Sequence, residues 1–219
     1  MLRQHKRLTK KELKKDPLVI FMAQAVDFIR DEWLKIASTV LAVVLVLVVG
    51  FLIVKGKKKS DINAYDAAMT ALVNNAPEAM DLLKRVVEDH GGSRYAGDAL
   101  IRLANSSYQM NDYDNAEKYF QQYIKKFSDD AVSSFNAFSG LGSVYEEQGK
   151  YKMAGETYER FINDYSKSVF RPLMHLNAGK AYFLSGDKDA ARRNFLAISE
   201  NYEDSKEKQE ADYFLELLN

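Results

Sequence analysis

The chain has 219 residues, contains no cysteine, and balances 31 Lys and Arg against 31 Asp and Glu. Without cysteine it has no disulfide, thiolate metal site, cysteine nucleophile or lipoprotein anchor. The charge is divided unevenly: residues 1–59 hold 13 basic and 5 acidic side chains, a net charge of +8, and residues 60–219 hold 18 and 26, a net charge of −8. The basic part suits anionic lipid headgroups, whereas the acidic part argues against a nucleic-acid partner, because phosphate contacts require clustered Lys and Arg.

Residues 1–15 carry seven Lys and Arg and few apolar side chains, so we expect a basic, disordered tail. Residues 16–33 are predicted to form an amphipathic helix, with Asp16 as N-cap and Pro17 as the first helical residue. We expect this helix to lie among the lipid headgroups with Trp33 as an interfacial ring, and docking on a partner membrane protein is the alternative. Its apolar residues at helical spacing are Leu18, Phe21, Met22, Ala25 and Ile29.

A long apolar run starts at Ile36 and ends at Val54. These 19 residues contain no charge and no proline, and 14 of them are Leu, Ile, Val or Phe. At about 1.5 Å per residue such a helix reaches roughly 28 Å, close to the thickness of a bilayer's hydrocarbon core. A soluble core helix would carry a polar stripe, and a cleaved signal peptide would have a shorter apolar region. Residues 36–54 therefore predict a transmembrane helix in the lipid bilayer, an uncleaved signal anchor.

The charges that flank this helix leave its orientation open. Close to the helix, the N-terminal side has two basic residues, Arg30 and Lys35, and the C-terminal side has four lysines in the predicted basic linker, residues 55–60. This local difference favours a C-terminal domain on the cytoplasmic side of the membrane. When the basic tail is included, the count becomes nine against four and favours the N-terminus inside.

From residue 61 onward the chain repeats with a period of 37 or 38 residues. Each unit ends with an aromatic or imidazole ring, followed three positions later by a polar residue. Inside each unit a turn precedes an alanine, with one apolar helical pattern before the turn and another after it. The ring and polar pairs are His90 and Ser93, Phe127 and Asp130, Tyr165 and Ser168, and Tyr202 and Ser205.

The repeat resembles the tetratricopeptide-repeat (TPR) pattern of helical hairpins. The middle unit carries the pattern as Phe138, Leu141, Gly142 and Tyr145 before the turn Gly149-Lys150-Tyr151, and Ala154, Tyr158, Phe161 and Ile162 after it. Two departures are His175 in place of the first bulky residue and Lys188 in place of the turn Tyr. The resemblance implies an all-α fold, a right-handed α-solenoid of TPR-like hairpins that follows the single N-terminal transmembrane helix. The expected hairpins are 61–90, 93–127, 130–165 and 168–202 within a domain at 61–219, closed by a capping helix at 206–218.

No residue pattern indicates catalysis or a cofactor. The three histidines are at positions 5, 90 and 175 without carboxylates at ligand spacing, and no nucleophile elbow, phosphate loop or zinc-helix motif is present. We expect neither a catalytic site, a metal site nor a bound cofactor, and the chain is not expected to be an enzyme.

In the TPR family the first helix of each hairpin lines a concave groove. The resemblance therefore implies a groove for proteins or extended peptides, polar with aromatic anchors. The positions that map onto it are Asp98, Arg102, Asn105, Tyr108, Gln109, Asn136, Ser139, Ser143, Glu146, Asn177, Lys180 and Phe183.

The basic tail, amphipathic helix, single span and acidic repeat domain together resemble the ancillary Sec-translocon subunits of bacterial inner membranes. This resemblance implies a single-pass inner-membrane protein with a cytoplasmic N-terminus and periplasmic repeats. Its implied partners are the Sec translocon, periplasmic chaperones and emerging polypeptides. Two alternatives remain open: a scaffold for envelope or division machinery, and a cytosol-facing receptor if the topology is reversed.

Overall fold

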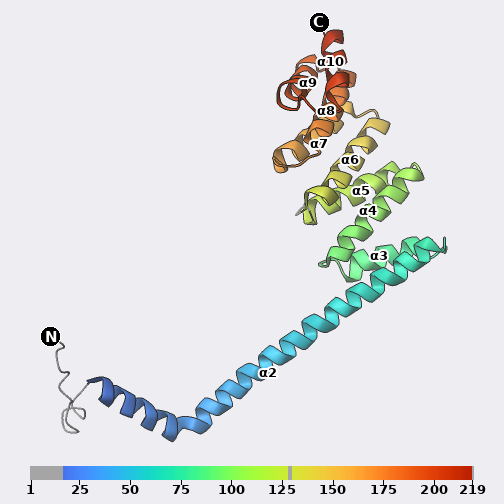
Figure 1. The fold of residues 1–219 in the computed structure, drawn as a ribbon. Coiled ribbons are helices and arrows are strands. Elements are labelled where there is room, and N and C mark those ends of the chain that lie inside the picture. Colours follow the sequence, from blue (N-terminus) through green and yellow to red (C-terminus); the bar gives the residue numbers. More distant parts are fainter. Residues whose placement is uncertain (1–16, 128–129, 219) are drawn as a thin grey trace, which may run out of the picture. The chain divides into compact units, whose positions relative to one another are not determined.

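The computed structural model describes residues 17–127 and 130–218, in which nine helices and no strand are present. The chain divides into two compact units, residues 1–57 and residues 58–219, which are described separately. The predicted basic tail, residues 1–15, lies outside the described residues. The first helix, α2, covers Pro17–Val73 and so contributes to both units (Figure 1).

The continuity of α2 differs from the expected division into an amphipathic helix, a span and a linker. Residues 55–60, expected as a basic linker, are helical, and no break separates them from residues 36–54. The physical reason is that lysine is a good helix former, and Gly56 alone costs only about 1 kcal/mol relative to Ala. The segment contains no proline that would remove a backbone hydrogen bond.

In the first unit, the apolar side chains of α2 are uncovered. Every residue from 36 to 54 is exposed, and Val46 and Leu47 keep 71% and 67% of their surface accessible. Among the described residues, one helical stretch, Arg30–Val73, is long and apolar enough to cross a membrane. A soluble core helix of this composition would instead be buried.

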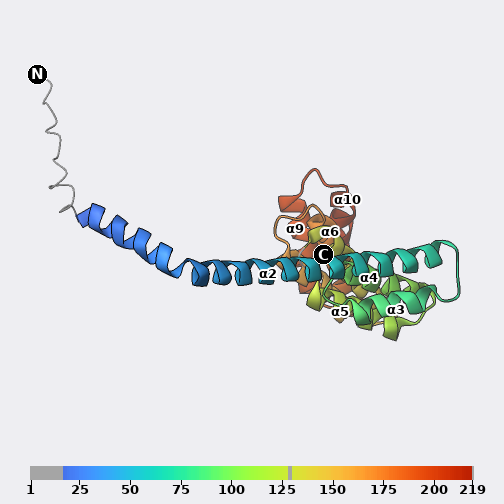
Figure 2. The ribbon, with the colours of Figure 1, turned by 90° about the horizontal axis from the view of Figure 1, so that it is seen from below.

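The second unit is a stack of antiparallel helix pairs. Each helix from α3 to α10 packs against the next along the chain, and α4 also contacts α6. The C-terminal end of α2 lies beside α3 (Figure 1 and Figure 2). The helices are α3 (Ala79–Asp89), α4 (Arg94–Gln109), α5 (Tyr113–Lys126), α6 (Ala131–Glu147), α7 (Tyr151–Asp164), α8 (Arg171–Ser185), α9 (Lys188–Asn201) and α10 (Lys208–Leu217).

The repeated ring and polar residues mark helix ends. The four rings are the C-cap residues of α3, α5, α7 and α9, and each backbone N–H donates to the carbonyl four residues earlier. Two of the polar residues are N-caps of the following helices: the Ser93 hydroxyl accepts from the N–H of Ala96 at the start of α4, and the Asp130 carboxylate accepts from those of Val132 and Ser133 at the start of α6. The other two, Ser168 and Ser205, lie three residues before the first residues of α8 and α10. The starts of α4 and α6, and those of α8 and α10, are 37 residues apart, whereas the starts of α6 and α8 are 40 residues apart.

The core of the stack depends on aromatic rings packed against glycine. A Cβ atom added at Gly142 of α6 would lie 2.2 Å from the ring of Tyr158 in α7, and one at Gly179 of α8 would lie 2.5 Å from the ring of Phe195 in α9. Both rings are at least 99% buried. The two helices of a hairpin therefore approach to a distance that only a glycine permits.

A separate, smaller cluster joins the end of α2 to the stack. Ala68 of α2 is buried against Leu83 and Val86 of α3 and Ala99 and Leu103 of α4. Two polar contacts supplement it: the Asp61 carboxylate is 2.6 Å from Nδ1 of His90, and Nε of Arg102 donates to the Tyr65 hydroxyl at 3.1 Å. The helix turns after Val73, where Asn75 adopts a positive φ of 51°.

A polar network lies between α7, α8 and α9. Nδ1 of His175 is 2.9 Å from Oδ1 of Asn194, whose amide donates to Glu159 at 2.8 Å, and the Tyr182 hydroxyl donates to the same carboxylate at 2.8 Å. Asn194 is only 3% exposed. Burial lowers the pKa of the His175 imidazole below its ordinary value of 6.5, against the opposing effect of its hydrogen bond to Asn194.

The close approach at Gly142 gives a stability prediction. Gly142→Ala should destabilise the repeat domain by about 1–3 kcal/mol, because the added methyl must displace a buried ring and this outweighs the gain in helix propensity. Urea unfolding followed by circular dichroism measures the change. Gly92→Ala is the matched control, since nothing lies within 4 Å of a Cβ there and its stability should be unchanged. Equal stability of both variants and the unmodified chain would contradict the packing argument.

The buried imidazole predicts a pH dependence. Below about pH 6.5 the unfolded chain takes up a proton that folded His175 resists, so this group's contribution to stability is present above pH 6.5 and is lost as the pH falls below it. The slope for one group is at most about 1.4 kcal/mol per pH unit. His175→Gln should reduce the slope between pH 7 and 5.5 in the same unfolding measurement. An unchanged slope would show that His175 is not its source.

Candidate functional site

The first helices of two successive hairpins enclose a hollow. It has a volume of about 340 Å³ and lies between α4 and α6, with one side chain from α5 beneath it. We call it the α4–α6 groove. It is lined by Asn105, Tyr108, Phe120, Phe135, Asn136, Ser139, Gly140 and Ser143.

The floor of the groove is apolar and fixed in place. The ring of Phe120 lies directly against the backbone of α6, where a Cβ atom on Gly140 would be only 2.2 Å away. Phe135 stacks on Phe170 with the ring centroids 4.1 Å apart and the planes 17° from parallel. Because both rings are held by packing, the groove offers a preformed apolar surface.

The rim of the groove is polar. Asn105 and Asn136 are exposed, and each amide provides both donors and an acceptor. Ser139 and Ser143 are half-buried one turn apart on α6. Amides beside an apolar floor can bind the backbone of an extended chain while its side chains contact the rings.

Two neighbouring carboxylates lie where α6 ends. The hydroxyls of Tyr108 and Tyr113 donate to the two oxygens of Glu147, at 3.4 and 3.5 Å. Glu146 accepts from the buried Tyr158 hydroxyl at 3.1 Å. Burial raises the pKa of Glu146, while the hydrogen bond from Tyr158 and the positive charge of Lys180 partly oppose this shift.

Comparison with known proteins agrees with these hairpins. The profile of the tetratricopeptide repeat-like domain family matches residues 31–197. The chain belongs to this family. No curated protein sequence matches it.

Two solved structures illustrate the likeness. PcrH from Pseudomonas aeruginosa is 23% identical over 57% of this chain and 93% of its own, with a TM-score of 0.47. A variant of the nearly identical TPR-like repeats assigned to a kinesin light chain of Podosopora anserina is 15% identical over 71% of this chain and 83% of its own, with a TM-score of 0.51. At this identity the second likeness concerns the fold alone, and it confirms the predicted all-α TPR-like solenoid. TPR-like domains generally act as protein-interaction modules, and catalysis is not typical of them.

The structure gathers only part of the predicted TPR groove. Asn105, Tyr108, Asn136, Ser139 and Ser143 line the α4–α6 groove. The other predicted groove residues do not line it. Arg102 bonds to Tyr65 and Lys180 is paired with Glu210 at 2.9 Å. Phe183 packs edge-on against Phe214, and Glu146 accepts a hydrogen bond from Tyr158. The other predicted groove residues that do not line the hollow are Asp98, Gln109 and Asn177.

Three lining residues were absent from the prediction. Phe135 shares one helical stripe with Ser139 and Ser143 at intervals of four, so helical spacing could have found it. Phe120 belongs to the second helix of its hairpin and enters the groove only because Gly140 leaves room for it. No spacing rule within one helix predicts such a contact.

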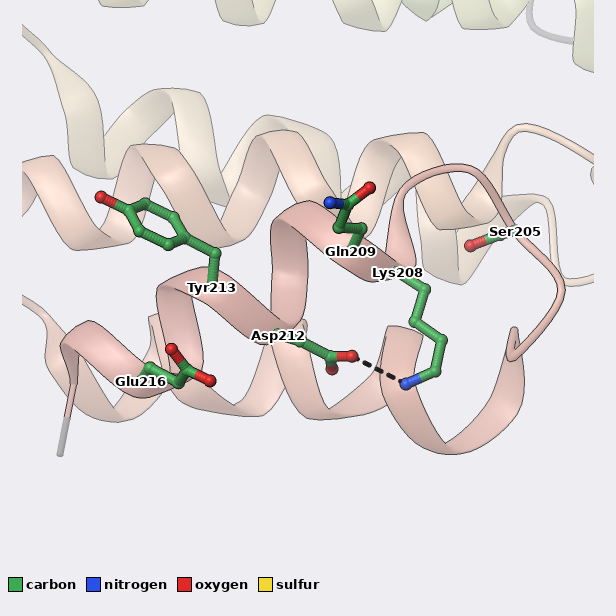
Figure 3. A pocket seen from close by; sticks show the side chains of 6 residues that line it. All are labelled: Ser205, Lys208, Gln209, Asp212, Tyr213 and Glu216. Carbon is green, nitrogen blue, oxygen red and sulfur yellow. Dashed lines mark hydrogen bonds and ion pairs between the residues drawn. The ribbon is translucent and has the colours of Figure 1, made fainter.

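A second hollow, of about 490 Å³, lies on the terminal helix α10 (Figure 3). It is lined by polar groups and one tyrosine, and the Lys208 ammonium is paired with Asp212 at 2.8 Å. Asp212 also accepts from the hydroxyl of Ser199. A polar end face whose charges already pair with one another is typical of the solvated cap that terminates a solenoid.

Within the described ranges, no group of three or more His, Cys, Asp or Glu is arranged to hold a metal ion. The side chains that line the α4–α6 groove offer hydrogen bonding and apolar contact.

Proposed function

We propose that this chain is a membrane-anchored TPR module that binds extended polypeptide segments in the α4–α6 groove. The observation that carries the proposal is the combination of a fixed apolar floor, Phe120 and Phe135, with exposed amides at Asn105 and Asn136. An unfolded segment exposes both backbone amides and apolar side chains, and the groove has a complementary group for each.

The proposed anchor is residues 36–54 of α2. Their uncovered apolar surface supports this role, because a water-exposed stripe of this size would be costly and a bilayer removes the cost. The family profile begins at residue 31, so it includes the apolar helix as well as the repeats. In this arrangement the N-terminus is cytoplasmic and the repeats lie in the periplasm of a bacterial inner membrane, as the nine Lys and Arg before the span, against four lysines after it, favour.

The proposed partner is the Sec translocon, with periplasmic chaperones as recipients of the emerging chain. The order of basic tail, apolar helix and acidic repeat domain supports it through the resemblance to ancillary translocon subunits. In this role the anchor contacts the channel, and the groove transiently holds segments before they fold.

Site-specific crosslinking tests this partnership. A photoreactive residue at Asn136, in the groove, should crosslink exported chains in vivo, and one at Val46, in the anchor, should crosslink translocon subunits. The matched control is Lys118, which is exposed on α5 outside the groove and should give neither product. The translocon role would be refuted if position 136 gave no crosslink to exported chains and position 46 gave none to translocon subunits.

A topology reporter tests the orientation. Alkaline phosphatase fused after Asn219 should be active, and a fluorescent protein that matures only in the cytoplasm should be dark at the same position. External protease should digest the repeats in spheroplasts with intact membranes. Digestion only after the membrane is opened would instead favour a cytosol-facing receptor.

A further inference from the structure

One end of the α4–α6 groove is charged, in addition to the apolar floor and amide rim described above. Tyr108 lines the groove, and its hydroxyl reaches the carboxylate of Glu147, the last residue of α6. The Tyr113 hydroxyl holds the second carboxylate oxygen. Along α6 the carboxylate lies roughly 10 Å beyond Gly140, against which the ring of Phe120 packs.

Glu147 is exposed and has no cationic partner among the described residues, since no Lys, Arg or His comes within ion-pair distance of it. Lys180 of the following hairpin is paired with Glu210 at 2.9 Å, and its positive charge also acts on Glu146. The neighbouring Glu146 adds to the negative potential, and the domain that surrounds both residues has a net charge of −8 over residues 60–219. This end of the groove therefore attracts positive charge and repels acidic side chains.

The two tyrosines add a second attraction for a cation. Their rings meet edge to face, with centroids 5.7 Å apart and planes at 61°. Rings presented beside a carboxylate favour a guanidinium or ammonium group, because the face of an aromatic ring carries partial negative charge. Aliphatic stems of Lys and Arg can also pack on such rings.

We propose that the groove selects extended segments in which an apolar or aromatic residue is followed or preceded, two positions away, by Lys or Arg. In an extended chain, residues i and i+2 point to the same side, about 7 Å apart. One side chain then enters the hollow over Phe120, and the long side chain of Lys or Arg spans the remaining distance to Glu147 past Tyr108. This inference rests on the proposed peptide-binding function and specifies its substrate class.

Peptide binding to the full chain in detergent tests the selection. The probes are fluorescent nine-residue Gly-Ser peptides with Phe at the fourth position and Lys, Gln or Glu at the sixth, and anisotropy measures their Kd. The Lys peptide should bind on the order of fivefold more tightly than the Gln peptide, and the Glu peptide more weakly than either. The preference should shrink as salt increases.

Substitution of Glu147 tests whether its carboxylate causes the preference for the Lys peptide. Glu147→Gln keeps an oxygen acceptor for the two hydroxyls but removes the charge, so the Lys and Gln peptides should then bind alike. Glu147→Lys should reverse the order in favour of the Glu peptide. The matched control is Glu200→Gln, an exposed carboxylate on α9, which should keep the preference.

The outcomes separate this inference from the function on which it rests. Ser139→Trp, which places a large ring in the groove, should weaken all three peptides, and circular dichroism verifies its fold. Equal binding of the three peptides, with loss in Ser139→Trp, would overturn the charge selection and leave the groove as the peptide site. If no peptide binds, or if Ser139→Trp binds as well as the unmodified chain, both proposals fail.

Discussion

The spacing between paired helices governs the rest of the repeat domain. In the third and fourth hairpins an aromatic ring of the second helix lies directly on a glycine of the first, Tyr158 on Gly142 and Phe195 on Gly179. A side chain at either glycine would push the helices apart. Because successive hairpins also pack on each other, the separation within one hairpin affects where the next one lies. At the α4–α6 groove the corresponding contact is that of Phe120 on Gly140.

The period and the helix pairs follow from residues that have local roles. Ser93 and Asp130 begin helices, and the rings of Phe127, Tyr165 and Tyr202 end them, so the repeat can be recognised without knowledge of tertiary contacts. The all-α solenoid was predictable for this reason. The helical state of residues 55–60 was not predicted, because a cluster of lysines is typical of a solvated linker, although lysine also favours a helix.

The candidate site was predictable only in part. Its amides and hydroxyls are on first helices, where the family pattern places a groove. Its floor includes Phe120, which reaches the groove from the neighbouring hairpin through the gap at Gly140. His175 likewise occupies a position that the pattern reserves for a bulky apolar residue, and it is accommodated because Asn194 and Glu159 extend a hydrogen-bonded network to it. Contacts of this kind depend on two helices at once, so no pattern along a single helix reveals them.

The cluster that joins α2 to the stack has a mechanical consequence. The large core extends from Leu100 to Leu218 and contains many aromatic rings, whereas the buried apolar residues at the end of α2 are two alanines, Ala68 and Ala71, with two polar contacts beside them. In a linear stack, each interface resists separation mainly through its own contacts. A pull applied along α2 would therefore detach this leading helix before the other hairpins open. Under such a force the contacts of α2 would separate first, and the α4–α6 groove would keep its structure.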